Sequence, residues 1–275
     1  MQNLVQVEEC LAFVRSKLGR NAGPYPVGLI LGTGLGDVTG DLEWQLPFAE
    51  LPHFPVSSAE SHAGFLAATT LSGVPVLVQS GRCHLFEGFS PAEICMGVRV
   101  MHGLGVQILV VTNAAGALNP AFEAGRLMLI CDQVNLTGVS PLTGINRETW
   151  GLRFPDMSEV FDVRLRALAQ TTAISLGIAL ERGVYVGVHG PELETPAETR
   201  LYRALGCDAI GMSSVLEIIS AKHLGMRILG LSCLTNKNLP DCMAPVTIED
   251  ILASSRRAAG DLERLLLAML PAMVA

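Results

Sequence analysis

The sequence predicts a single α/β domain with a central, mixed but largely parallel, twisted sheet flanked by helices. Short β-rich apolar runs alternate with helical patterns throughout the 275 residues. Several runs are apolar at every position, as in strands that helices cover on both faces. We find no internal repeat, low-complexity tract or linker, so residues 1–275 are expected to form one domain.

The candidate strands are the short apolar runs rich in Val, Ile and Leu. They are VGLILG (27–32), VPVLVQS (74–80), VQILVVTN (106–113), LMLICDQ (127–133), GVYVGVHG (183–190), CDAIGM (207–212) and RILGLSCLTN (227–236).

Helix starts between these strands are marked by capping boxes, in which a hydroxyl residue precedes a Glu or Asp three positions later. The predicted boxes are Ser90 with Glu93, Thr195 with Glu198, Ser214 with Glu217, and Thr247 with Asp250. Glycines at 103, 206 and 225 stand where three helices should stop, and the last helix should run to about residue 270. The long irregular stretch 140–157 is expected to be functional or an oligomer contact.

Composition excludes several classes of protein. The net charge of −7 and the lack of a basic cluster disfavour a nucleic-acid partner. Seven scattered cysteines without a C-x-x-C pair indicate reduced thiols rather than disulfides or a zinc site. The chain shows neither a secretory signal nor an apolar run of the ~20 residues that span a bilayer. We therefore expect a cytoplasmic protein with no membrane partner.

Glycine-rich turns follow two of the predicted strands. In open α/β sheets, ligands bind beyond the carboxyl ends of the strands. The turn GTGLGD (32–37) offers backbone N–H groups and the hydroxyl of Thr33 to a phosphate. A dinucleotide fingerprint is incomplete there because Asp37 stands in place of its last glycine. The small residues of NAAGALN (113–119) allow close approach of a ligand, although a plain tight turn is the better explanation of this segment taken alone.

Arg82 and His84 follow the strand at 74–80. Because they alternate in an extended chain, both side chains should point to one side, where a guanidinium fork and an imidazole suit a phosphate. An internal ion pair of Arg82 beside a packed His84 is the competing interpretation. Ser213, at a predicted helix start, is a further candidate anion ligand.

Three glutamates lie in VHGPELETPAETR (188–200), just after an apolar run. Glu198 belongs to a capping box and Glu192 suits a solvated surface, so Glu194 is the carboxylate with no local role. In a cleft it could accept a hydrogen bond from a ring N–H, or it could settle on nearby helix N–H groups. Asn236, after another strand, can both donate and accept, which suits the edge of a heterocycle or a simple turn.

Taken in chain order, these segments resemble the serial motifs of the trimeric purine nucleoside phosphorylases of the 6-oxopurine type, within the nucleoside and methylthioadenosine phosphorylase superfamily. The similar segments are GTGLG (32–36), GRCHLFEG (81–88), VTNAAGALNP (111–120), GPELETPAE (190–198), DAIGMSSVLEII (208–219) and LTNKN (234–238).

The resemblance implies a pentosyltransferase that cleaves inosine or guanosine with phosphate, giving the free purine and ribose 1-phosphate in purine salvage. It implies a phosphate site of Thr33, His62, Arg82, His84, the backbone of Ala114, and Ser213. It implies nucleoside contacts from Phe86, Tyr185, Leu193, Glu194, Met212, Thr235, Asn236 and Ile248, with Phe154 reaching in from a neighbouring subunit of a homotrimer. Catalysis is expected from His84, Glu194 and Asn236.

In that chemistry the glycosidic bond breaks early, so the purine gathers negative charge while the ribose becomes cationic. Asn236 would donate to purine N7 and stabilise the charge as it develops. Glu194 would accept from N1–H and orient the base. Phosphate is both nucleophile and counter-charge, so no metal or organic cofactor is expected.

Five positions depart from the family pattern. Phe86 replaces a tyrosine of the family, and Leu193 replaces a phenylalanine that stacks on the base. Ile248 replaces a histidine near the ribose 5′-hydroxyl. Thr33 replaces a serine and keeps its hydroxyl, and His189 is an additional histidine whose role is packing or hydrogen-bond donation.

The apolar departures leave other substrates open, namely a 5′-modified (methylthio) nucleoside or xanthosine. The pair Asn236-Lys237, where methylthioadenosine phosphorylases use aspartate, favours a 6-oxopurine. A nucleoside-binding protein that has lost catalysis, and a dinucleotide-dependent oxidoreductase, are the alternatives from other classes. The retained phosphate set argues against the first, and the incomplete glycine fingerprint against the second.

Overall fold

The computed structural model describes residues 2–32, 40–58 and 64–275. Its α-helices are α1 (Gln2–Leu18), α2 (Pro91–Ile94), α3 (Met96–Gly103), α4 (Val163–Leu176), α5 (Pro196–Ala204), α6 (Val215–His223) and α7 (Ile248–Val274). Its strands are β1 (Val27–Leu31), β2 (Trp44–Pro47), β3 (Phe65–Leu71), β4 (Val74–Ser80), β5 (Ile108–Ala117), β6 (Leu127–Asn135), β7 (Leu180–Gly187), β8 (Ala209–Gly211) and β9 (Arg227–Lys237). Short 3-10 turns are η1 (Gly19–Asn21), η3 (Phe48–Glu50) and η4 (Leu85–Glu87).

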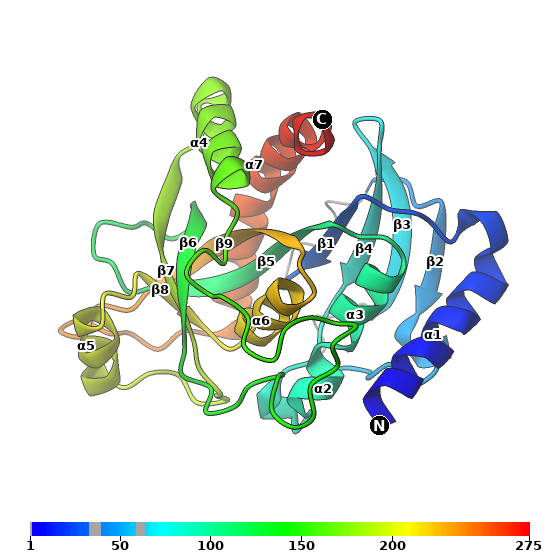
Figure 1. Cartoon of the computed structure of the whole chain (residues 1–275). Coiled ribbons are helices and arrows are strands. Elements are labelled where there is room, and N and C mark those ends of the chain that lie inside the picture. The colour runs from blue at the N-terminus through cyan, green and yellow to red at the C-terminus, as the bar shows by residue number, and fades with distance from the viewer. Residues whose placement is uncertain (1, 33–39, 59–63) are drawn as a thin grey trace.

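The described strands form one mixed sheet in the order β2-β3-β4-β1-β5-β8-β7-β6-β9. Because β9 also pairs with β5, the strands β5, β8, β7, β6 and β9 close on themselves into a barrel-like half, and β1 to β4 extend from it as an open wing (Figure 1). Strands β4, β1, β5 and β9 run parallel to one another, whereas β3 pairs antiparallel with β2 and with β4. The predicted α/β class with a mixed sheet is confirmed.

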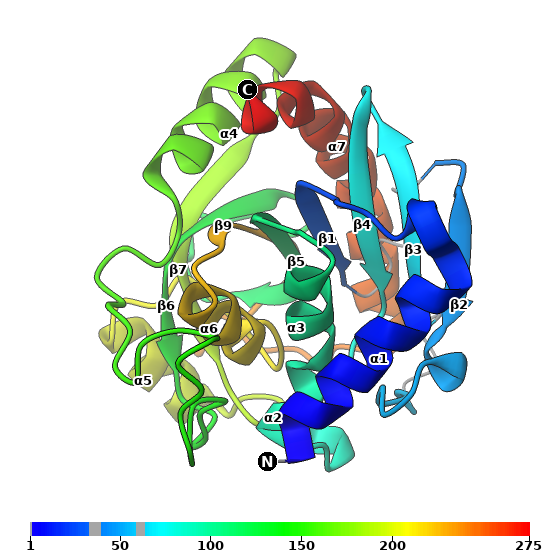
Figure 2. The ribbon, with the colours of Figure 1, turned by 45° about the vertical axis from the view of Figure 1, so that its right-hand side comes forward.

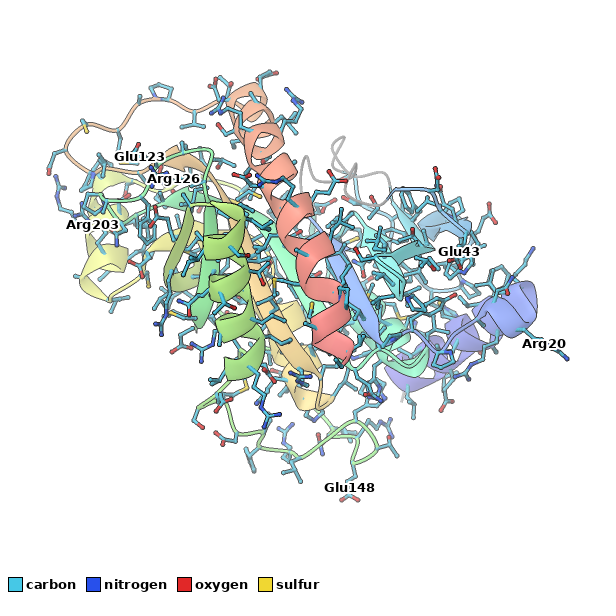
Figure 3. The ribbon with its side chains drawn as sticks, turned by 90° about the horizontal axis from the view of Figure 1, so that it is seen from above. Arg20, Glu43, Glu123, Arg126, Glu148 and Arg203 are labelled. Carbon is cyan, nitrogen blue, oxygen red and sulfur yellow. The ribbon has the colours of Figure 1, made fainter. Side chains whose placement is uncertain are left out.

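Helices cover both faces of the sheet, which explains why its central strands are apolar at every position. On one face, α1, α3 and α6 contribute Val14, Met101 and Ile218 to a core with β1, β4 and β5 (Figure 2). On the other face, α4 and α7 lie side by side over the sheet and bury Leu165 and Leu262 (Figure 3). The sheet is therefore shielded on both sides, and ligands can reach it only at the ends of its strands.

The seven predicted strands are all present, with ends displaced by a few residues. The structure adds β2 and β3, which the sequence analysis did not find. In β2 alternate residues are exposed over only four positions, and in β3 alanine and threonine interrupt the apolar run. Helices α1 and α4 were also not predicted. Both begin without the hydroxyl-x-x-Glu pattern, since α4 is capped by the carboxylate of Asp162.

Three of the four predicted capping boxes are formed, at Ser90, Thr195 and Thr247. The fourth prediction is wrong: Ser214 precedes α6 but makes no cap hydrogen bond. Its backbone has a φ of 68°, and its Oγ accepts from Arg82 and Asn113 instead. The last helix continues past its predicted end to Val274, and Pro271 lies inside it. The stretch 140–157 contains neither helix nor strand, as its composition predicts.

Candidate active site

Polar side chains from several strand ends meet beside the junction of the open wing and the barrel-like half. Arg82 and His84 follow β4, Ser213 and Ser214 follow β8, and Thr235 and Asn236 belong to β9. These strands all pair with β1 or β5, so residues far apart in the sequence are brought to one edge.

Arg82 lies at the centre of a buried group that we call the arginine cluster (Arg82, Thr112, Asn113, Ser214 and Glu217). Its Nη1 donates to Ser214 Oγ at 2.8 Å and lies 3.2 Å from Glu217 Oε2, and its Nη2 donates to the carbonyl of Thr112 at 2.6 Å. Asn113 Nδ2 also donates to Ser214 Oγ, at 2.9 Å. The internal ion pair that the sequence left open is therefore present, and a phosphate role for Arg82 stays a prediction.

Both charges of this ion pair are shielded from water, with Arg82 2% and Glu217 1% exposed. Burial raises the pKa of the Glu217 carboxyl, and the Arg82 charge acts against that rise. Ser214 and Glu217, predicted to cap α6, serve instead as partners of Arg82. The first residues of α6 therefore bind the guanidinium of Arg82 instead of capping the helix.

His84 is held by Glu87, three residues later. Glu87 Oε1 accepts from the backbone N of His84 at 2.9 Å and lies 2.8 Å from its Nδ1, while Oε2 accepts from Ser57 and Ser58. Burial alone would raise the pKa of Glu87, but the hydrogen bonds from His84 and the two serines outweigh it and lower the pKa to about 2. Glu87 therefore stays ionised and accepts a proton-bearing Nδ1.

Burial lowers the pKa of His84, with the Arg82 charge adding to the effect and Glu87 opposing it. The imidazole is accordingly neutral near pH 7, with its proton on Nδ1 and its acceptor lone pair on Nε2. The ring of Phe86 stacks on the His84 ring with centroids 4.7 Å apart. A phenyl ring, instead of the family's tyrosine, therefore covers this imidazole.

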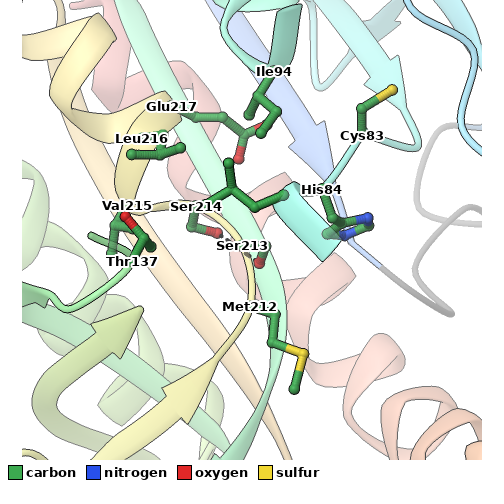
Figure 4. A pocket seen from close by; sticks show the side chains of 11 residues that line it. Cys83, His84, Ile94, Thr137, Met212, Ser213, Ser214, Val215, Leu216 and Glu217 are labelled. Carbon is green, nitrogen blue, oxygen red and sulfur yellow. Dashed lines mark hydrogen bonds between the residues drawn. The ribbon is translucent and has the colours of Figure 1, made fainter. Parts of the chain in front are cut away.

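A pocket lies between the segment after β4 and the start of α6 (Figure 4). His84 faces Met212 and Ser213 across it, and Thr137 lies toward the β6 side. The hydroxyls of Ser213 and Ser214 are 3.3 Å apart. The polar groups that line the pocket, His84 and the two serines, are of the kind that bind a phosphate.

Tyr185 lies behind this pocket rather than in it. Its side chain is fully buried, and its hydroxyl donates to the carbonyl of Ser213 at 3.3 Å. Burial raises the pKa of Tyr185 to about 12, so the hydroxyl keeps its proton. In this structure Tyr185 supports Ser213, and its predicted contact with a nucleoside stays untested.

The predicted base-reading residues form a second group, which we call the amide chain (Glu194, Asn238, Asn236 and Thr235). Asn238 Nδ2 donates to Glu194 Oε2 at 2.7 Å, Asn236 Nδ2 donates to Asn238 Oδ1 at 2.6 Å, and Thr235 Oγ1 donates to Asn236 Oδ1 at 2.9 Å. Burial raises the pKa of Glu194, and the hydrogen bond from Asn238 moderates that rise.

A β-bulge gives the amide chain its shape. The pairing of β5 with β9 shifts between Ala115 and Gly116, so Thr235 has no opposite residue and Asn236 faces Gly116. A Cβ on Gly116 would lie 2.8 Å from Asn238 Nδ2, so a side chain at this position would displace the amide. This accounts for the glycine of NAAGALN, which the sequence alone could not separate from a plain turn.

Not every predicted residue joins these groups. Phe154, in the 140–157 stretch, is 85% exposed, and Leu193 is 54% exposed. Ala114 lies in β5 opposite Cys233 and does not line the pocket. Thr33 and His62 lie outside the described residues, and so does the side chain of Ile248, whose backbone begins α7.

The sequence analysis missed several residues of the two groups and the partner of His84. They are Glu87, Asn113, Ser214 and Glu217 on the phosphate side and Asn238 on the base side. All five lie within the quoted motif segments, with Glu87 in GRCHLFEG and Asn238 at the end of LTNKN. The others become partners only when α6 and β5 pack beside β4.

Within residues 2–32, 40–58 and 64–275, no three His, Cys, Asp or Glu side chains are placed to hold a metal ion. None of the helices described is both long enough and apolar enough to cross a membrane.

Comparisons with known proteins agree on one family. The family model described as the phosphorylase superfamily matches residues 26–271. The chain is 44% identical to purine nucleoside phosphorylase 1 of Bacillus subtilis, over 90% of this chain and 91% of that protein. It is also 44% identical to the purine nucleoside phosphorylase of Mus musculus, over 86% of each chain. The structure is similar to isoform 2 of purine nucleoside phosphorylase from Schistosoma mansoni in complex with cytosine and ribose-1-phosphate, with a TM-score of 0.89, 30% identity, and coverage of 96% of this chain and 95% of that one.

Proposed function

The chain belongs to the phosphorylase superfamily, and we propose that it catalyses the phosphate-dependent cleavage of purine nucleosides to the free base and ribose 1-phosphate. One observation carries this proposal. The chain is 44% identical to a purine nucleoside phosphorylase, and it has a pocket suited to phosphate at the same sheet edge as a carboxylate and an amide suited to a purine. A phosphorylase must hold these two chemically different ligands side by side.

In the reaction an oxygen of phosphate forms a bond to ribose C1′ as the C1′–N9 bond breaks, and the electron pair of that bond passes to the purine. Asn236 donates an N–H to purine N7 and stabilises the negative charge that develops there. Glu194 accepts from N1–H and orients the base. Both side chains are on the amide chain, so the leaving group is held through a single hydrogen-bonded unit.

On the phosphate side, the neutral His84 offers Nε2 as an acceptor to a protonated phosphate oxygen or a ribose hydroxyl, and Ser213 offers its hydroxyl. Arg82 acts as a fixed positive charge behind the pocket, because both of its Nη atoms already have partners in the arginine cluster. The chemistry uses phosphate as co-substrate, and we propose no metal or organic cofactor.

We further propose a homotrimer that acts in purine salvage in the cytoplasm. Phe154 supports the trimer because its ring is 85% exposed at the end of a long irregular segment, as expected of a residue that completes a neighbouring subunit's site. The substrates proposed are the 6-oxopurine nucleosides inosine and guanosine. Phe86 and Ile248 stand where the family has a tyrosine near the ribose and a histidine near its 5′-hydroxyl, which supports tolerance of a 5′-methylthio group.

The test is release of hypoxanthine from inosine with and without phosphate, together with 5′-deoxy-5′-methylthioinosine. Phosphate-dependent release from inosine is the expected result. Release only from the methylthio compound would assign the site to 5′-modified nucleosides. Release from neither, with retained binding of hypoxanthine, would overturn catalysis in favour of a nucleoside-binding protein.

A further inference from the structure

The carboxyl of Glu217 has no part in the proposed reaction, although it lines the pocket that is proposed to hold phosphate. Glu217 lies in the first turn of α6 and is 1% exposed. Its carboxyl lies on the side of the pocket opposite Met212 (Figure 4). What we infer for this carboxyl rests on the proposed function.

Glu217 is the counter-charge of Arg82 when no phosphate is bound. Arg82 is 2% exposed, and its Nη1 lies 3.2 Å from Glu217 Oε2. A buried guanidinium without an anion beside it is very costly, so the carboxyl must be ionised to balance it. The protein itself therefore neutralises the charge of Arg82 before phosphate arrives.

The hydroxyl of Ser214 connects this ion pair to the pocket. Its Oγ accepts from Arg82 Nη1 at 2.8 Å and from Asn113 Nδ2 at 2.9 Å, which uses both of its lone pairs. Its own hydrogen is thus left to donate, and Ser213 Oγ lies 3.3 Å away. Because Ser213 accepts this hydrogen, the hydroxyl of Ser213 can donate to an anion in the pocket.

Phosphate brings a second counter-charge to the same guanidinium. Among the described residues that line the pocket or bond to Arg82 and His84, Arg82 is the only cation, whereas Glu217 and Glu87 are both carboxylates. A phosphate dianion therefore enters a buried site that already holds more negative than positive charge. Like charges in one buried site raise each other's pKa until one of the groups takes up a proton.

Glu217 is the group placed to take up that proton. Burial acts to raise the pKa of Glu87, but hydrogen bonds from His84 and two serines lower it to about 2, so Glu87 stays ionised. The imidazole of His84 has its proton on Nδ1, and burial lowers its pKa. Burial instead raises the pKa of the Glu217 carboxyl, against the Arg82 charge and the backbone N–H of Ser214. An anion bound nearby adds to this rise.

The other ionisable groups around Glu217 do not compete for the proton. Burial raises the pKa of Cys83, Cys95 and Tyr185 to about 12, so all three are already protonated. Charged side chains on the elements that pack against α6 are directed to partners of their own. These are Glu93 to Ser90, Arg99 to the carbonyls of Ala92 and Pro141, Asp132 to the backbone of Gln133, Arg227 to Asp162, and Lys237 to Glu123.

We propose that Glu217 is a positioning residue that takes up a proton from solvent as phosphate binds, so that Arg82 exchanges its counter-charge from the carboxylate to the phosphate. The guanidinium keeps its place, because Ser214 and the carbonyl of Thr112 still hold it. When ribose 1-phosphate leaves, the carboxyl returns the proton to solvent and again neutralises Arg82. Phosphate binding is therefore linked to pH, and the affinity falls as the pH rises above neutral.

The direct test is isothermal titration calorimetry of phosphate binding to the wild type at about pH 8, where phosphate in solution is mainly the dianion. Repeating the titration in buffers with different ionisation enthalpies gives the number of protons exchanged. The variants are Glu217→Gln, which imitates the protonated carboxyl, and His84→Gln, which removes the other pocket group able to accept a proton. The control is Glu181→Gln, whose carboxylate pairs with Arg126 near the surface.

For the wild type and the control we expect uptake of about one proton per phosphate, and a KM for phosphate that rises up to about tenfold per pH unit above neutral. Glu217→Gln should show no uptake and a phosphate affinity about tenfold higher at about pH 8, because its side chain needs no proton. Without phosphate its Arg82 lacks a counter-charge, so phosphate should raise the midpoint of thermal unfolding more than in the wild type. His84→Gln should keep the proton uptake.

No proton uptake in the wild type, or undiminished uptake in Glu217→Gln, would overturn the proposal. Uptake that is lost in His84→Gln and retained in Glu217→Gln would also overturn it, because the proton would then belong to the imidazole. If Glu217→Gln does not fold even with phosphate, the wild-type proton count and the His84→Gln titration decide. A wild type that neither binds phosphate nor releases base from inosine would instead overturn the proposed function.

Discussion

The arginine cluster and the amide chain lie at the same sheet edge but differ in the charge of their side chains. The arginine cluster pairs Arg82, just after β4, with Glu217 in α6, and the two side chains are 2% and 1% exposed. The amide chain has one carboxylate and two neutral amides, placed by a β-bulge and a loop. The first group holds two opposite charges away from water, whereas the second is linked mainly through neutral amides.

This difference assigns different tasks to the two groups. A buried ion pair is costly to disrupt because a lone charge would be left without water. Amides in a chain can exchange donor and acceptor without moving their backbone. We therefore expect changes in the arginine cluster to affect stability most strongly, and changes in the amide chain to affect turnover and base selection.

The largest expected effect is on stability, for Arg82→Met. Removing the guanidinium leaves the Glu217 carboxyl buried without its partner, which should lower the free energy of unfolding by about 3–5 kcal/mol. Urea denaturation followed by circular dichroism measures this. The matched control is Arg227→Met, since Arg227 pairs with Asp162 at the surface and should lose less than about 1 kcal/mol. Equal losses in the two variants would contradict the distinction between the two groups.

The next effect is on turnover, for Asn236→Ala. Loss of the donor to N7 should lower kcat by about 10²–10³, because the interaction strengthens only as charge develops on the base. Nucleoside affinity should change much less, and stability little. Steady-state kinetics with inosine test this beside Asn119→Ala, whose amide contacts Asp208 away from the pocket. A parallel loss of affinity and turnover would remove Asn236 from the transition state.

A smaller effect is expected for Glu194→Ala. The variant loses a charged hydrogen bond to the base, worth about 1.5–3 kcal/mol in kcat/KM for inosine. Because Asn238 also loses its acceptor, base selection should weaken together with rate. Competition between inosine and adenosine measures both. An unchanged kcat/KM for inosine would show that Glu194 does not read the base.

The smallest effect is the acid sensitivity that Glu87 confers. Its folded-state pKa is depressed to about 2, so its stabilisation is present above its unfolded pKa of 4.5 and is lost as the pH falls toward 2. With allowance for solvent screening, about 1–2 kcal/mol is at stake. Comparing the unfolding free energy of the wild type and Glu87→Gln at neutral and acidic pH should show a weaker pH dependence in the variant. Parallel pH curves would contradict this.

Local sequence predicted the residues whose partners are near in the chain. The capping boxes at Ser90, Thr195 and Thr247 formed because their partners are three residues away. The same rule failed at Ser214 and Glu217, because Arg82, 132 residues from Ser214, competes for both side chains. Strand β3 was missed because its alternation is weak, and only its pairing with β2 and β4 makes it a strand.

The sequence by itself determined the α/β class, the seven central strands and the family motifs, because apolar runs and short-range hydrogen bonds depend only on residues that are close together in the chain. Tertiary structure decided how those motifs work together. It closed five strands into a barrel-like half, buried Arg82 against Glu217, and placed Asn238 between Glu194 and Asn236. These contacts join segments distant in the chain, and the low-polarity interior that makes them strong exists only once the sheet and its helices have packed.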